Sequence, residues 1–154
     1  MKELVELLKL KNKTISSMES CTGGGFVNAI TNIEGASEVV YYSAVTYSNE
    51  FKIKMGVNEE VIAKSSVYSI ETAKEMSKAI SDFTNSSFGV GITGKLNRVD
   101  KNNLYGEDNI VFVSVYNREN NVYHNKSIKV DKDTRCKNKE LVIEEIVNML
   151  KTIM

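Results

Sequence analysis

The sequence contains no proline and a single histidine, and its two cysteines stand far apart. Because no proline-rich or low-complexity segment divides the chain, we expect one domain over residues 1–154. No apolar run approaches the length of a membrane-spanning helix, so we expect no membrane partner. Cys21 and Cys136 lack the spacing of metal ligands, which favours free thiols and predicts neither a metal nor another cofactor.

The sequence also has no net charge, because its 20 basic and 20 acidic side chains balance each other. This balance argues against a broad nucleic-acid-binding surface, although a local basic patch stays open. The first eight residues place acidic side chains inside an apolar pattern, which predicts a helix rather than a signal peptide. We therefore expect a cytoplasmic protein; the composition does not fix whether it forms a homo-oligomer.

The turn from Glu19 to Gly25 organises the predicted fold. It lies between the alternating run 14–18, which is typical of a strand, and a helix-period run that ends near Asn32. A glycine-rich turn before a helix leaves backbone N–H groups without intrahelical partners, which favours an anion or a developing oxyanion. Ser20 and Cys21 stand in this turn, so each is a candidate nucleophile.

The remaining pattern alternates helices and strands and then ends in a hairpin and a helix. Further strands are predicted at 39–47, 87–93, 110–116 and 122–130. Helices are predicted at the N-terminus, at 49–55, after Asn58, after Ser69 and at about 137–153. The buried stripe of the helix after Ser69 is expected to consist of Ala73, Met76, Ile80 and Phe83. This order predicts a three-layer α/β/α sandwich with a mostly parallel five-stranded sheet and a C-terminal antiparallel hairpin.

In such sheets the site lies beyond the carboxyl ends of the strands. Ser20, Tyr47 and Thr93 all fall at such ends, so their side chains could converge. The single histidine, His124, lies in the middle of a hairpin strand, and no sequence feature pairs it with Ser20. A histidine-based catalytic triad is therefore poorly supported.

Two motifs resemble the CinA C-terminal domain, the nicotinamide-nucleotide amidase family. Residues 19–24, Glu-Ser-Cys-Thr-Gly-Gly, are similar to one family signature, and residues 45–52, Val-Thr-Tyr-Ser-Asn-Glu-Phe-Lys, to a second. Gly56-Val57, Ser69 and residues 91–94, Gly-Ile-Thr-Gly, also fit the family pattern. The resemblance covers essentially the whole chain, so we expect a stand-alone domain of this kind.

The resemblance implies an α/β/α fold and hydrolysis of the carboxamide of nicotinamide mononucleotide to nicotinate mononucleotide and ammonia, a reaction of NAD salvage. By matched position, Ser20 corresponds to the nucleophile, and Tyr47 and Lys52 to its catalytic partners. The residues that we assign to binding of the nucleotide substrate are Cys21, Thr22, Gly23, Gly24, Thr93 and Gly94.

For a Ser-Lys mechanism, Lys52 must act as a neutral amine, which requires that burial or a nearby cation lower its pKa. Tyr47 could relay the proton or orient the lysine. The backbone N–H groups around Thr22 and Gly23 could stabilise an oxyanion or hold the substrate phosphate, and the sequence does not decide between these uses. Cys21 stays a rival nucleophile that we rank below Ser20.

The chain departs from the family in the loop 94–109. The family usually follows Thr-Gly with Ile-Ala-Gly-Pro and further glycines, whereas here Lys95, Arg98 and Asp100 follow. We expect this charged loop to be mobile or folded outward in the free protein. If the loop has lost its role, the alternative function is a non-catalytic nucleotide-binding or protein-interaction module. The family's near-terminal Asp-Arg then Arg pattern appears only partly, at residues 133–139.

Overall fold

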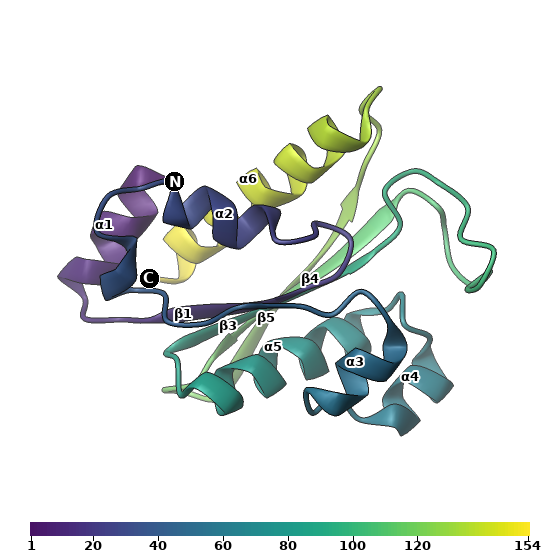
Figure 1. Cartoon of the computed structure of the whole chain (residues 1–154), viewed down its shortest axis with the longest axis horizontal. Coiled ribbons are helices and arrows are strands. Elements are labelled where there is room, and N and C mark those ends of the chain that lie inside the picture. Colours follow the sequence, from purple (N-terminus) through teal and green to yellow (C-terminus); the bar gives the residue numbers. More distant parts are fainter.

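The computed structural model describes all 154 residues as a five-stranded sheet between two layers of helices (Figure 1). The strands are β1 (Ile15–Glu19), β2 (Ala44–Val45), β3 (Phe88–Gly94), β4 (Ile110–Asn117) and β5 (Val122–Lys129). The helices are α1 (Lys2–Leu10), α2 (Gly25–Thr31), α3 (Asn49–Lys54), α4 (Glu59–Ser65), α5 (Ile70–Thr84) and α6 (Arg135–Ile153), with a 3₁₀ turn η1 at Ala36–Glu38. Helices α1, α2 and α6 cover one face, and α3, α4 and α5 lie on the other.

The strand order is β2-β1-β3-β4-β5. Strand β1 pairs in parallel with β2 and β3, whereas β3 with β4 and β4 with β5 pair antiparallel. The predicted three-layer sandwich with a C-terminal hairpin is therefore confirmed, and the sheet is mixed. The parallel half brings the carboxyl ends of β1, β2 and β3 to one edge, where functional residues were expected.

Glycines in β3 let helix α5 lie directly against the sheet. A Cβ atom on Gly91 would stand 2.1 Å from the carbonyl oxygen of Ala73, and one on Gly89 would stand 2.0 Å from that of Ser77. No side chain fits at such distances, so these two positions require glycine. The backbone of α5 therefore lies directly against this strand.

Two details of the predicted elements were wrong. The second strand was expected over residues 39–47, but its ladder with β1 contains only Ala44 and Val45. The N–H of Ser17 is bound by the hydroxyl of Ser43 rather than by a backbone carbonyl, so regular pairing begins after that residue. Phe83 was expected in the core but is exposed, because it packs on the ring of Tyr42, which is itself partly exposed.

The turn between β1 and α2 is built around the fully buried carboxylate of Glu19. Its two oxygens accept five hydrogen bonds of 2.7 to 3.1 Å, from the hydroxyls of Ser17 and Thr22 and the backbone N–H groups of Gly24, Phe26 and Val27. The first N–H groups of a helix need acceptors, and the glycine that precedes α2 has no side chain to supply one. Glu19 therefore caps α2 from the preceding strand and fixes the path of the turn.

We predict that Glu19→Gln lowers the free energy of unfolding by about 2 kcal/mol, because an amide NH₂ group would replace an acceptor that faces buried donors. Urea unfolding followed by circular dichroism measures this change. The matched control is Glu38→Gln, which removes an exposed carboxylate paired with Lys9 and should cost less than about 0.5 kcal/mol. Equal losses in the two variants would contradict the capping role.

Candidate functional site

A cavity of about 730 Å³ lies at the edge where β1, β2 and β3 end. Its walls come from the turn after β1, the residues that begin α3, the linker before α5, the loop 94–109 and the start of α6. Five separate segments of the chain therefore meet at one site. Two of the three predicted catalytic groups, Ser20 and Lys52, contact each other there, and the third, Tyr47, lines the same cavity.

Lys52 is the central side chain of the site and is 1% exposed. Helix α3 places it there, because the hydroxyl of Ser48 caps this helix at the N–H of Phe51 and so fixes its first turn. The Nζ atom of Lys52 lies 3.2 Å from the Oγ atom of Ser20 and donates a 2.7 Å hydrogen bond to the carbonyl oxygen of Thr46. The carbonyl fixes the amine so that it faces the serine hydroxyl.

Burial lowers the pKa of Lys52 from its ordinary value of 10.5 to about 8. No carboxylate lies within ion-pair distance of its amine, so no ion pair offsets the loss of hydration by the charged form. With this pKa roughly one lysine in ten is neutral at pH 7, against about one in several thousand for an ordinary lysine. Lys52 is therefore suited to accept a proton from Ser20.

Tyr47 does not contact this pair in the structure. Its side chain is 65% exposed, and its hydroxyl accepts a 3.1 Å hydrogen bond from the guanidinium of Arg135. Tyr47 thus forms a wall of the cavity. The catalytic role that the resemblance implies for this residue stays a prediction.

Cys21 also lines the cavity, but its chemistry differs from that of Ser20. Burial raises the pKa of its thiol to about 12, and the nearby positive charge of Arg135 offsets this only in part. A thiol attacks efficiently only as a thiolate, and this one stays protonated near neutral pH. Of the two candidate nucleophiles, only Ser20 has a hydrogen-bonded base.

The other residues assigned to substrate binding mostly hold the backbone in place. The hydroxyl of Thr22 and the N–H of Gly24 donate to Glu19, and the N–H of Gly23 donates to the carbonyl of Ser20. The hydroxyl of Thr93 donates to the carbonyl of Val67, and Gly94 alone of these residues lines the cavity. Since the N–H of Gly23 is already bonded, the N–H groups of Cys21 and Thr22 are the two at this turn without a backbone acceptor, and Cys21 is the one of these two residues that lines the cavity.

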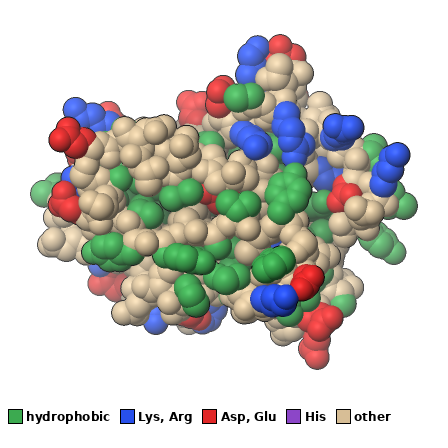
Figure 2. Space-filling view, viewed as in Figure 1, with side chains coloured by type: hydrophobic (Ala, Val, Ile, Leu, Met, Phe, Trp, Pro, Cys, Tyr) green, Lys and Arg blue, Asp and Glu red, His purple; other side chains and the backbone are tan.

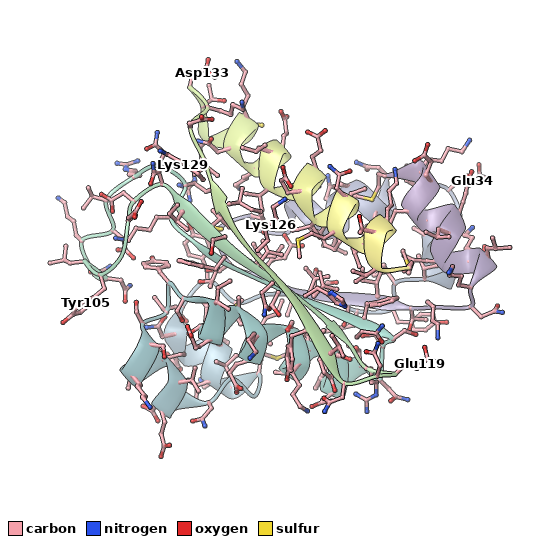
Figure 3. The ribbon with its side chains drawn as sticks, turned by 180° about the vertical axis from the view of Figure 1, so that it is seen from behind. Glu34, Tyr105, Glu119, Lys126, Lys129 and Asp133 are labelled. Carbon is pink, nitrogen blue, oxygen red and sulfur yellow. The ribbon has the colours of Figure 1, made fainter.

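The loop 94–109 has a buried base and an outer part that extends away from the sheet (Figure 1). At its base, the buried amine of Lys95 forms a 2.9 Å ion pair with Asp108, and Leu96 packs into the core. The hydroxyl of Tyr68 donates to Asp100 and ties the loop to the linker before α5. Tyr105 lies far out on the exposed tip (Figure 3). The prediction of an outward-folded loop is therefore confirmed for the tip and wrong for the base.

The sequence alone did not identify two polar groups of the site. The carbonyl of Thr46 binds Lys52, and Tyr68 binds the loop. Thr46 stands inside the motif 45–52, so the motif itself was a signal, whereas Tyr68 has no local pattern that marks it. His124 pairs with Val115 in the ladder between β4 and β5 and does not line the cavity.

Two further features describe the whole chain. The structure contains no group of three or more histidine, cysteine, aspartate or glutamate side chains arranged to hold a metal ion. None of its helices combines the length and the apolar character needed to cross a membrane.

Similar proteins carry the same fold. The chain can be superposed on the CinA superfamily protein of Escherichia coli with a TM-score of 0.88 at 19% identity, over 99% of this chain and 87% of that one. It can also be superposed on the competence/damage inducible protein CihA of Agrobacterium tumefaciens with a TM-score of 0.84 at 25% identity, over 98% and 93% of the two chains.

Proteins of similar sequence carry related names. A CinA-like protein of Chloroherpeton thalassium is 47% identical over 90 residues, which are 58% of this chain and 21% of the relative. A putative competence-damage inducible protein of Clostridium beijerinckii is 39% identical over 114 residues, 73% of this chain and 28% of the relative. The match thus spans about a quarter of these relatives' length. The family model of the CinA C-terminal domain matches residues 1–154, and the chain belongs to this family.

Proposed function

We propose that this domain hydrolyses the carboxamide of nicotinamide mononucleotide to nicotinate mononucleotide and ammonia, with Ser20 as nucleophile and Lys52 as base. The observation that carries the proposal is the 3.2 Å contact between the Nζ atom of Lys52 and the Oγ atom of Ser20, at a buried amine whose pKa is lowered. A purely structural lysine would have no reason to lie buried beside a serine without a carboxylate partner.

In the first step, the neutral amine of Lys52 accepts the hydroxyl proton of Ser20 while Oγ attacks the carboxamide carbon. The negative charge moves to the carboxamide oxygen, which the N–H of Cys21, a residue that lines the cavity, can bind. The C–N bond then breaks, and the ammonium of Lys52 returns its proton to the leaving nitrogen. Ammonia departs, and the acyl group stays on Ser20 as an ester.

In the second step, Lys52 is again neutral and accepts a proton from a water molecule. The water oxygen attacks the ester carbon, the bond to Oγ breaks, and the proton returns to Ser20. The carbonyl of Thr46 holds the amine in place through both steps. The product is a carboxylic acid that releases the second water proton to solvent and leaves as a carboxylate, and the enzyme is unchanged, so the atoms balance.

The cavity also suits a nucleotide. A volume of about 730 Å³ is in the range of sites that enclose small ligands. Four basic side chains and one acidic side chain line it, so the site favours an anionic substrate over a neutral one. This charge supports a substrate that carries a phosphate.

We predict that Ser20→Ala lowers the rate of ammonia release from nicotinamide mononucleotide by at least about a thousandfold, because the nucleophile is lost while the turn keeps its hydrogen bonds to Glu19. Cys21→Ser, the control at the neighbouring position, should keep most of the activity. An active Ser20→Ala variant beside an inactive Cys21→Ser variant would move the role to Cys21. No ammonia release from the wild-type protein would contradict the proposed reaction and favour the non-catalytic module.

A second prediction concerns pH. Lys52 can accept a proton only when neutral, so kcat/KM should rise with pH and reach half its maximum near pH 8, where the lowered pKa lies. Lys52→Met should abolish this rise together with the activity. Lys54→Met, the matched control, removes an exposed lysine of the same helix that is paired with Glu50 and should leave the profile unchanged. A profile that stays flat from pH 6 to pH 9 would speak against Lys52 as the base.

A further inference from the structure

The basic side chains that line the cavity are not equivalent. They are Lys52, Lys95, Arg98 and Arg135. Figure 2 shows Lys and Arg side chains gathered over the start of α6 and the loop 94–109, on the face where the cavity lies. Which of them can bind an anion depends on which charges are already neutralised.

Two of the four are committed to other partners. Lys52 is buried and bound to Ser20, and its proton takes part in the proposed chemistry. The side chain of Lys95 is only 2% exposed, and its amine is neutralised by Asp108 at 2.9 Å. Two guanidinium groups remain, from Arg98 and Arg135, and neither forms an ion pair within the protein.

Arg98 is the more independent of these two. Arg135 donates to the hydroxyl of Tyr47, whereas the side chain of Arg98 makes no hydrogen bond to the protein. The acidic group closest in sequence, Asp100, does not neutralise it. That carboxylate already accepts bonds from the hydroxyl of Tyr68, the side chain of Asn103 and the N–H of Asn102, and these donors lower its pKa to about 2.

The same contacts hold Arg98 at the cavity. The bond from Tyr68 to Asp100 ties the loop to the linker before α5, and the N–H of Arg98 donates to the carbonyl of Asp108 at 3.3 Å. The backbone of Arg98 is therefore fixed on both sides although its side chain is exposed. A guanidinium without an ion-pair partner, on a fixed backbone, is suited to bind two oxygens of one phosphate group through two parallel hydrogen bonds.

We infer that Arg98 binds the phosphate of the substrate and is a specificity-determining residue of this site, an inference that rests on the proposed function for the identity of the substrate. The charged loop thus supplies a phosphate ligand through a side chain. Lys95, the other basic residue of the loop base, serves instead to hold the loop through Asp108.

Isothermal titration calorimetry with ribose 5-phosphate tests this inference on the intact chain, because this probe carries the phosphate but no amide. We expect the wild-type protein to bind ribose 5-phosphate and not ribose, and Arg98→Gln to weaken the binding at least tenfold. The matched control is Lys101→Gln, which removes an exposed positive charge from the same loop outside the cavity and should change affinity less than twofold.

Equal affinities of wild type and Arg98→Gln, equal weakening in Lys101→Gln, or no binding of ribose 5-phosphate by the wild-type protein would overturn the inference. The outcome is separable from that of the amidase proposal. Binding lost in Arg98→Gln without ammonia release from nicotinamide mononucleotide would support the phosphate site and refute the reaction. Ammonia release by the wild-type protein, with unchanged binding of ribose 5-phosphate in Arg98→Gln, would support the reaction and refute the phosphate site at Arg98.

Discussion

The chemistry proposed for the site depends on the buried amine of Lys52. Taking a lysine out of water without a carboxylate partner disfavours its charged form, and the pKa of about 8 corresponds to a cost of ~3 kcal/mol for keeping the proton. The only partners of the amine are the hydroxyl of Ser20 and the carbonyl of Thr46. Such a lysine contributes little to stability in its charged form, so its position is better explained by proton transfer than by folding.

Lys52 can accept a proton from Ser20 only if the position of Ser20 is fixed as well. The neighbouring acidic residue, Glu19, fixes the turn that carries Ser20. The carboxylate of Glu19 is buried and is satisfied by five donors from the turn and from α2. The next residue in the chain is Ser20, whose N–H donates to the carbonyl of Ile92 in β3. The serine is thus fixed from both sides, by a cap on α2 and by the central sheet, while α3 brings the lysine to it.

The elements that depend on local sequence were predictable. Alternation and helical periodicity placed β1, β3, β4, β5 and the long helices. The side chains of Ser48, Asn58 and Ser69 cap the helices that follow them. The contact between Ser20 and Lys52 came from the family resemblance, because residues 32 positions apart show no local signal of meeting.

The features that the sequence analysis missed depend on contacts between distant segments. Strand β2 is short because the side chain of Ser43 takes a bond that the ladder would use, and Phe83 packs on the ring of Tyr42 rather than in the core. The base of the loop is buried because Asp108 neutralises Lys95 and Tyr68 binds Asp100. Composition suggested an outward loop, since charged side chains alone do not reveal that Lys95 pairs with Asp108 or that Tyr68 binds Asp100 from outside the loop.

Before any substrate binds, Lys52 should be largely a neutral amine at slightly alkaline pH. Heteronuclear NMR of protein labelled with ¹³C-lysine measures this directly, because the Cε chemical shift of each lysine follows the protonation of its own amine. The resonance absent from Lys52→Met identifies the residue. We expect a midpoint near pH 8 for this resonance, well below the ordinary lysine value of 10.5. A midpoint near 10.5 for Lys52 would contradict it.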